Sequence, residues 1–289
     1  MTQVAHTLYS SGLVRVQDVV CSEGCGRGRH EEQCLAASLA FVRSGTFVRR
    51  DRMGRHVADA TRVVFFDPTE PYMVDHPVPG GDRCTVLAFN DATLRESVRP
   101  ARGDPQRLFE RSTLAGTAEI HLAHRELIAG ARERDAVRVE ENALALLQLC
   151  TGTPQRVRSG GAAQRRSAAL AHEAQVLIAA CYAERVTLEG LASRLDVSPF
   201  GLCRAFRAAT GTTLHRHLTD LRLVAALDRL PDYRDRLTAL ALDLGFSSHS
   251  HFTHAFREYY GHAPATIAQR VHRRSMRSAP NAPAREQAS

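Results

Sequence analysis

The spacing of hydrophobic residues differs between the two halves of the chain. Over about the first 90 residues, apolar positions come in short stretches, and Val14 and Val16 alternate with Arg15. Turns rich in glycine and proline separate these stretches, for example between Pro77 and Gly81. Short runs of this kind predict the β-strands of a sandwich or a small barrel. The turn Ser44-Gly45, between two apolar stretches, predicts a β-hairpin with a two-residue loop.

From residue 120 onward, apolar positions recur every three to four residues, which is the period of a helix. The first expected helical face comprises Ile120, Ala123, Leu127 and Ala131, and the second comprises Val137, Leu144 and Leu147. Two such helices either close the core of the sheet-rich half or form the seam of a dimer. The sequence leaves both interpretations open.

The C-terminal half contains one helix–turn–helix pattern twice, about fifty residues apart. The first copy spans residues 191–207 and closes at Gly211, and the second spans 240–257 and closes at Gly261. Between the copies, residues 214–229 are amphipathic and predict one long helix. A helix–turn–helix unit commonly reads DNA, and two in tandem can read neighbouring major-groove segments, which lie about 34 Å apart. The long helix is therefore expected to set the spacing of the two units.

The second helix of each copy is expected to bury one face and to present the other to DNA. Ser198 is suited to cap the first of these helices, and the core face of the second is expected to include Tyr259. Arg204 is predicted to make a forked contact to guanine, Phe200 to touch a thymine methyl group, and Arg207 to meet phosphate. The candidate DNA-binding residues are Phe200, Cys203, Arg204, Arg207, His249, Ser250, His251, His254 and Arg257.

Charge is distributed unevenly along the chain. Residues 1–150 carry a net charge of −1 and residues 151–289 carry +8, and every basic residue is an arginine. A basic half beside a near-neutral half is expected when only one half binds a polyanion. The expected organisation is a sensing and dimerisation domain (1–150), a linker (151–167), a DNA-binding domain (168–272) and a disordered tail (273–289).

The second copy carries the strongest similarity to a known family. The AraC/XylS family of bacterial transcription regulators has a signature that this chain resembles at Gly245-Phe246-Ser247-Ser248-His249-Ser250-His251-Phe252, at Phe256-Arg257, and at Gly261 and Pro264. The resemblance extends from Leu188 to about Gln269. It implies a seven-helix domain that reads two adjacent major-groove segments with the second helix of each copy.

The N-terminal half resembles, more loosely, the cupin-type sensing and dimerisation domain of the same family, over residues 65–72 and 76–84. The expected fold is therefore α+β, with an N-terminal cupin-like β-barrel and helical hairpin followed by an all-α tandem helix–turn–helix domain. The resemblance implies an effector-responsive transcriptional activator. Its expected partners are double-stranded DNA, a small-molecule effector, a second copy of the chain in a homodimer, and RNA polymerase.

Cysteine and histidine residues offer the main alternative chemistry, because thiolates and imidazoles bind metals and thiols respond to oxidants. Two sets are possible, namely Cys21, Cys25, His30 and Cys34, or Cys21, His76 and Cys84. The first spacing matches no common zinc finger, so neither a metal nor a cofactor is expected. A metal-dependent enzyme of the cupin class is the other alternative. The histidines before residue 90 form no closely spaced pair, and enzymatic activity is therefore not expected.

No apolar run approaches the roughly 18 residues that a membrane span needs, and the N-terminus shows no secretory pattern. Seven cysteines without such a pattern favour reduced thiols. The sequence therefore predicts a cytoplasmic protein without a membrane segment.

Overall fold

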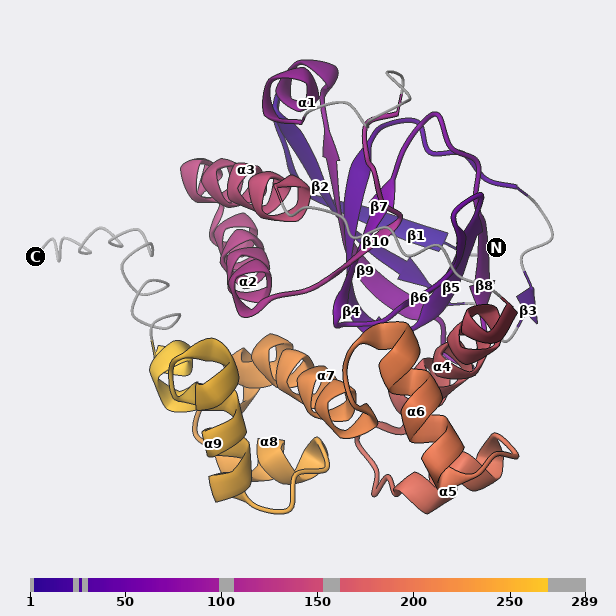
Figure 1. Ribbon diagram of the computed structural model, residues 1–289. Coiled ribbons are helices and arrows are strands. Elements are labelled where there is room, and N and C mark those ends of the chain that lie inside the picture. The colour runs from indigo at the N-terminus through magenta and orange to yellow at the C-terminus, as the bar shows by residue number, and fades with distance from the viewer. Residues whose placement is uncertain (1–2, 23–25, 28–30, 99–106, 153–161, 270–289) are drawn as a thin grey trace, which may run out of the picture.

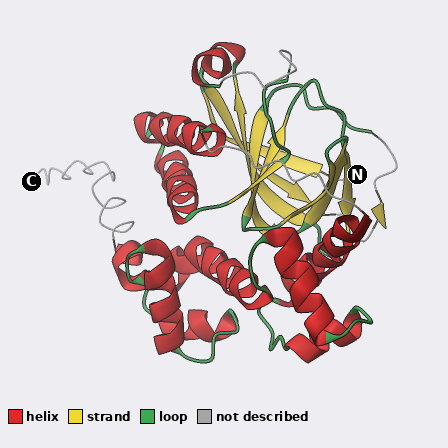
Figure 2. Cartoon of the chain, in the orientation of Figure 1, coloured by secondary structure: helices red, strands yellow, loops and turns green. Residues whose placement is uncertain are grey.

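The computed structural model describes residues 3–22, 26–27, 31–98, 107–152 and 162–269 (Figure 1). Strands gather in the N-terminal part and helices in the C-terminal part (Figure 2). The predicted α+β class is thus confirmed. We call residues 3–152 the sheet-rich region and residues 162–269 the helical region.

The larger of two sheets has six antiparallel strands in the order β1-β2-β9-β4-β7-β10. Their bounds are Gln3–Ser10 (β1), Val14–Cys21 (β2), Asp82–Phe89 (β9), Ser38–Gly45 (β4), Arg62–Phe66 (β7) and Thr113–Ala115 (β10). In β4, Leu39 and Phe41 belong to a core on one face of this sheet, whereas Ala40 and Val42 belong to a core on the other. The larger sheet is therefore covered on both faces, which explains the continuous apolar run in its central strand.

The smaller sheet has the order β3-β8-β5-β6, with bounds Gly26–Arg27 (β3), Met73–His76 (β8), Phe47–Asp51 (β5) and Gly54–Ala58 (β6). It faces the larger sheet across a shared apolar layer. The buried members of this layer are Ala40, Val42, Phe47, Ala58, Val64 and Cys84, with Phe66, Val74 and Val86 packed against them.

The hairpin predicted around Ser44-Gly45 is wrong. Strand β4 pairs with β7 and β9, whereas β5 pairs with β6 and β8, so the chain crosses from one sheet to the other at Thr46. Only glycine fits at this crossing. The φ of Gly45 is 75°, and a Cβ at this position would lie 2.1 Å from the Gly81 carbonyl oxygen. The Thr46 hydroxyl then donates to the Ala58 carbonyl oxygen at 2.8 Å. The spacing of apolar residues cannot distinguish a hairpin from such a crossing, because both consist of two strands joined by a tight turn.

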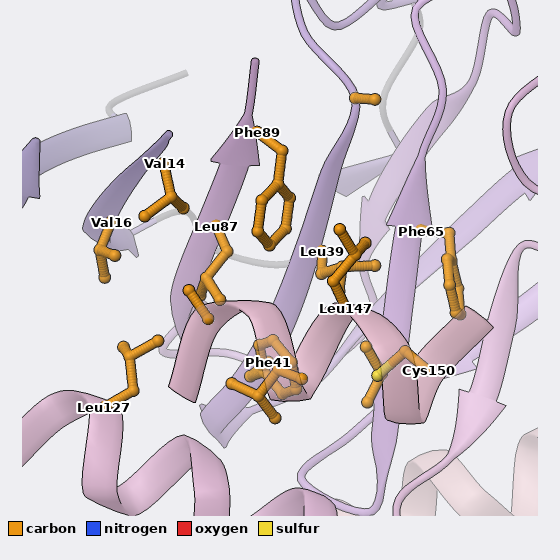
Figure 3. Close-up of a cluster of buried hydrophobic side chains, with 14 of the residues drawn as sticks. Val14, Val16, Leu39, Phe41, Phe65, Leu87, Phe89, Leu127, Leu147 and Cys150 are labelled. Atoms are coloured by element: carbon orange, nitrogen blue, oxygen red, sulfur yellow. The ribbon is translucent and has the colours of Figure 1, made fainter. Parts of the chain in front are cut away.

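The sheet-rich region also contains α1 (Asp91–Ser97), between β9 and β10, and α2 (Ala118–Glu133) and α3 (Ala136–Thr151), which follow β10. Helices α2 and α3 form the predicted helical hairpin and pack on the outer face of the larger sheet, as Figure 3 shows for Leu127, Leu147 and Cys150. The predicted face of α3 is wrong in part, because Val137 is 66% exposed. The tight turn between the helices orients α3 so that the face containing Val139 meets the sheet instead.

The helical region contains α4 (Ala162–Cys181), α5 (Leu188–Arg194), α6 (Pro199–Thr210), α7 (Leu214–Arg229), the short 3-10 helix η1 (Leu230–Tyr233), α8 (Leu237–Asp243) and α9 (His249–Tyr260). A further helical stretch covers 264–269. Because α4 begins at Ala162, the last part of the predicted linker is helical. Residues 153–161 of that linker, and the predicted tail, lie outside the described residues. None of the described helices combines the length and the apolar character that crossing a lipid bilayer requires.

Candidate DNA-binding surface

The first helix–turn–helix unit consists of α5 and α6. The Ser198 hydroxyl caps α6 by accepting a hydrogen bond from the Gly201 amide at 3.1 Å, and Pro199 occupies the first turn. The helix ends at Gly211, whose φ of 80° is the left-handed conformation common at helix C-termini. Each of these positions agrees with the sequence prediction, because helix caps depend on local residues.

The second unit, α8 and α9, repeats this construction. The Ser248 hydroxyl accepts from the His251 amide at 3.1 Å, and Gly261 ends α9 with a φ of 75°. The turns match as well. The amide of Val197 donates to the Ala192 carbonyl oxygen at 3.0 Å in the first unit, and that of Phe246 donates to Ala241 at 3.0 Å in the second. The two units are therefore alike in their caps and in their turns.

The turn residue with positive φ differs between the units, being Asp196 (φ 52°) in the first and Gly245 (φ 80°) in the second. Gly245 lies against the segment that follows α4, where an added Cβ would be 2.8 Å from the Ala183 carbonyl oxygen. Arg222 of α7 holds that segment by donating to the carbonyl oxygens of Tyr182 and Glu184, at 2.7 and 2.9 Å. Both the conformation and the close approach require glycine at position 245.

Helix α6 presents its four candidate residues to solvent. Leu202 and Phe206 are fully buried on its inner face, whereas Phe200 is 75% exposed and Cys203, Arg204 and Arg207 are also exposed. The guanidinium carbon of Arg204 lies 5.9 Å from the centre of the Phe200 ring. This cation–π contact between residues one turn apart restricts the position of the Arg204 side chain.

The candidates on α9 are exposed too, and they are His249, Ser250, His251, His254 and Arg257. Two imidazoles contact neighbouring hydroxyl groups: His251 Nδ1 lies 3.2 Å from the Ser247 hydroxyl and His249 Nε2 lies 3.4 Å from that of Thr253. On the inner face Phe252 and Phe256 are buried. Tyr259, predicted to belong to this core, is only partly buried, and Tyr260 is the buried tyrosine.

Helix α7 has the bounds that the sequence predicted and lies between the two units, with α6 on one side and α9 on the other (Figure 1). Leu218 and Leu221 join the core of the first unit, and Leu223 and Ala226 join that of the second. One continuous helix therefore contributes to both cores, which fixes the distance between α6 and α9.

The helical region docks on the sheet-rich region through polar contacts that the sequence did not reveal. Arg43 of β4 pairs with Asp228 of α7, with Nη2 and Oδ1 3.0 Å apart. Buried Asp59, in the turn after β6, lies 3.3 Å from His217 Nε2 of α7. Burial alone would raise the pKa of Asp59, but His217 and the Thr61 hydroxyl outweigh it and lower that pKa.

Helix α2 also takes part in this interface. The ring of His121 stacks on that of Tyr259 of α9, with centroids 6.1 Å apart, and burial lowers the pKa of His121 to about 4. His124 stacks on Phe41 at 4.6 Å, and burial lowers its pKa to about 3. Both imidazoles are therefore neutral near pH 7.

A cavity of about 300 Å³ lies at this interface, between β4, α2 and α7. Its wall combines apolar groups, such as Phe41 and Ile128, with the side chains of Arg43 and Arg125. The Nε and one terminal nitrogen of Arg125 are buried without a hydrogen-bond partner among the described residues. The cavity thus offers an apolar surface and unsatisfied donors.

The second predicted cysteine–histidine set is brought together in the sheet-rich region with one change. Donor atoms of Cys21, His76 and Asp82 lie within 4.8 Å of one another, and the Cys84 thiol donates to Asp82 Oδ2 at 3.1 Å. Asp82 was not among the ligands predicted from the sequence. In the other predicted set, Cys25 and His30 lie outside the described residues.

Comparison with known proteins supports the assignment of the helical region as a helix–turn–helix domain. A family model described as a helix–turn–helix domain matches residues 191–270. The transcriptional activator RhaS of Escherichia fergusonii is 38% identical over 88 residues, which cover 30% of this chain and 32% of that protein. The chain therefore aligns with about a third of the length of this curated relative.

Two solved structures also match the C-terminal part. A DNA-binding transcriptional dual regulator from Escherichia coli K-12 is 29% identical over 35% of this chain and 96% of its own, with a TM-score of 0.33. A protein from Rhodopseudomonas palustris, described as a probable AraC family transcriptional regulator, is 28% identical over 36% of this chain and 97% of its own, with a TM-score of 0.33. The C-terminal part of this chain is thus similar to a helix–turn–helix domain and to part of the activator RhaS, in agreement with the resemblance to AraC/XylS-family regulators in the sequence signature.

Proposed function

We propose that this chain is a sequence-specific DNA-binding transcription regulator that reads two adjacent major-groove segments with α6 and α9. The observation that carries the proposal is the repeated construction of the two units on one shared helix. Each unit caps its second helix with serine, ends it with a left-handed glycine and leaves the same outer face exposed. Two matched helices held at a fixed separation suit the helical repeat of duplex DNA.

In this proposal, contacts to bases give sequence specificity and contacts to phosphates give most of the affinity. Arg204 offers a forked donor for the O6 and N7 atoms of guanine, and exposed Phe200 beside it offers an apolar surface for a thymine methyl group. Arg207 and Arg257, one turn farther along their helices, would meet phosphate. Arginine–phosphate contacts release counterions, so affinity should fall steeply as salt is raised.

We further propose that a small anionic effector binds in the cavity between the two regions and changes how the helical region is held. Support comes from the cavity's wall, which joins apolar groups to Arg43 and Arg125, and from its position against α7. A ligand there would contact both regions at once. It would act by favouring one arrangement of the two regions over another.

The remaining expected partners stay part of the proposal. RhaS is named a transcriptional activator, which favours activation and hence contact with RNA polymerase. A homodimer is expected because two-fold oligomers are the most common kind. Exposed Val137 on α3 identifies an outer helix face that such a dimer would cover.

The test of DNA reading begins with selection from a random duplex library by the full chain. The selected duplex then serves for binding measurements on the unaltered protein and on Arg204→Ala, with Arg95→Ala as the matched control on exposed α1. Loss of about 1–3 kcal/mol, concentrated at one base pair, is expected for Arg204→Ala only. Absence of any enriched sequence, or equal effects of the two substitutions, would refute the proposal.

The effector is tested separately, with a panel of small organic acids and their uncharged amides. We expect selected acids to raise the unfolding temperature and to change the affinity for the selected duplex, and Arg125→Met to remove both effects. Acids that bind with equal strength to Arg125→Met would place the effector elsewhere.

A further inference from the structure

The sheet-rich region contains a buried cluster of metal-binding side chains that the proposed DNA-reading function does not use. The thiol of Cys21, a ring nitrogen of His76 and a carboxylate oxygen of Asp82 lie within 4.8 Å of one another. The three residues are 8%, 4% and 9% exposed. Groups of this kind, placed together away from solvent, are unusual unless they bind something or one another.

Backbone pairing explains how the cluster forms. Cys21 and Asp82 are direct partners in the antiparallel ladder of β2 and β9, so their side chains leave the same face of the larger sheet. His76 is the last residue of β8 in the smaller sheet, and a short turn leads from it to Asp82. The cluster therefore contains donors from both sheets and lies where they meet.

A fourth donor adjoins the three. Cys84 follows Asp82 by two positions in β9, so both point to the inner side of the sheet. The Cys84 thiol lies 3.1 Å from one Asp82 oxygen, while His76 Nε2 lies 2.7 Å from the other. Asp82 thus links the histidine to the second cysteine.

The donor set favours one class of ion. Thiolate and imidazole ligands suit Zn²⁺, whereas Mg²⁺ and Ca²⁺ require oxygen ligands. Four protein donors with no open position would make a structural zinc site. Ligands about 2.0–2.3 Å from a metal lie roughly 3.5 Å apart, so the hydrogen bond between His76 and Asp82 would lengthen by somewhat less than 1 Å on binding.

There is space for this adjustment. A cavity of about 120 Å³ is lined by all four residues, together with Glu32 and Tyr72 and several apolar side chains. The four side chains could therefore move by small amounts to coordinate an ion next to this cavity, without breaking the β2–β9 ladder.

We propose that Cys21, His76, Asp82 and Cys84 bind one Zn²⁺ ion that joins the two sheets of the sheet-rich region. This site is independent of the DNA-reading helices, and it replaces the expectation from sequence that no metal is bound. Its ligands come from β8 of the smaller sheet and from the paired strands β2 and β9 of the larger sheet, so the ion would cross-link the two sheets. Folding and metal binding are then coupled.

The first test is the metal content of the full chain, purified under reducing conditions without chelator. About one zinc per chain is expected. Cys21→Ser, His76→Gln and Cys84→Ser should each lose most of it, whereas Cys181→Ser should retain it. Cys181 lies in α4, where its thiol donates to the Leu177 carbonyl oxygen, and serine can do the same. Zinc that persists in Cys21→Ser and His76→Gln would overturn the proposal.

The second test uses the unaltered protein and does not depend on how the variants fold. After zinc is removed with a chelator, titration with Co²⁺ should give tetrahedral absorption with a thiolate-to-cobalt charge-transfer band. Adding back Zn²⁺ should raise the unfolding temperature and slow modification of two thiols. A protein that takes up neither ion, or that binds Co²⁺ without the charge-transfer band, would contradict the site.

Discussion

Arg43 of β4 and Asp228 of α7 form an ion pair between the sheet-rich region and the helical region, with 3.0 Å between Nη2 and Oδ1. The Nε of Arg43 also donates to the same oxygen at 3.2 Å, so the contact is forked. Arg43 lies 3.5 Å from Asp18 as well, and its side chain is only 7% exposed. The pair is well placed to fix where α7, and with it both helix–turn–helix units, lies on the larger sheet.

We predict that Asp228→Asn weakens this docking. Because Asp228 is 39% exposed, solvent screens the pair, and a loss of about 1 kcal/mol in the free energy of unfolding is expected. Urea unfolding of Asp228→Asn and of Asp232→Asn, an exposed aspartate in η1, provides the comparison. Equal stability of the two variants would show that the ion pair does not hold the regions together.

Gly245 and Gly261 give a second prediction, because both have positive φ but only one is crowded. An added Cβ at Gly261 meets nothing within 4 Å, whereas at Gly245 it would lie 2.8 Å from the Ala183 carbonyl oxygen. Gly261→Ala should cost about 1–2 kcal/mol for the left-handed conformation alone. Gly245→Ala should cost clearly more, since the steric clash adds to that conformational cost. Thermal unfolding of the two variants measures the difference, and equal losses would contradict the packing of the second turn.

Buried histidines predict how stability depends on pH. Burial lowers the pKa values of His121 and His172 to about 4 and that of His124 to about 3, whereas an unfolded histidine has a pKa of about 6.5. Between pH 6.5 and 4 the unfolded chain therefore binds more protons than the folded chain. The contribution of these three histidines to the free energy of unfolding is therefore complete above pH 6.5 and is lost as the pH falls toward 4.

His124→Phe tests this prediction with little change in shape. Among the described residues, His124 Nε2 is buried without a hydrogen-bond partner, and its ring stacks on Phe41. The variant should keep the stack and lose less stability than the unaltered protein between pH 7 and 5. The same pH dependence in both proteins would mean that His124 does not titrate on unfolding.

Features that depend on neighbouring residues could be predicted from sequence. Ser198 as a cap, Gly211 as an end and the bounds of α7 follow from local preferences and from one period of apolar residues. The alternation of Val14 and Val16 with Arg15 likewise identified β2. These predictions succeeded because the residues within each helix or strand determine where it starts, where it ends and which face it buries.

Features that depend on how elements pack could not be predicted. Residues 44–45 make a tight turn either way, and only the pairing of β4 and β5 with other strands shows that it joins two sheets. Asp82 joins Cys21 through a strand register that no local pattern fixes. Contacts such as Tyr259 with His121 join residues far apart in the chain, and each of them is unremarkable in its own segment.

We propose that α6 and α9 read neighbouring turns of one duplex. Footprinting of the full chain on its selected duplex, repeated with Arg204→Ala and with the double variant His251→Ala/His254→Ala, tests it most directly. We expect two protected major-groove segments about 34 Å apart, with Arg204→Ala weakening one and the histidine variant weakening the other. A single protected segment, or one that both variants weaken alike, would contradict it.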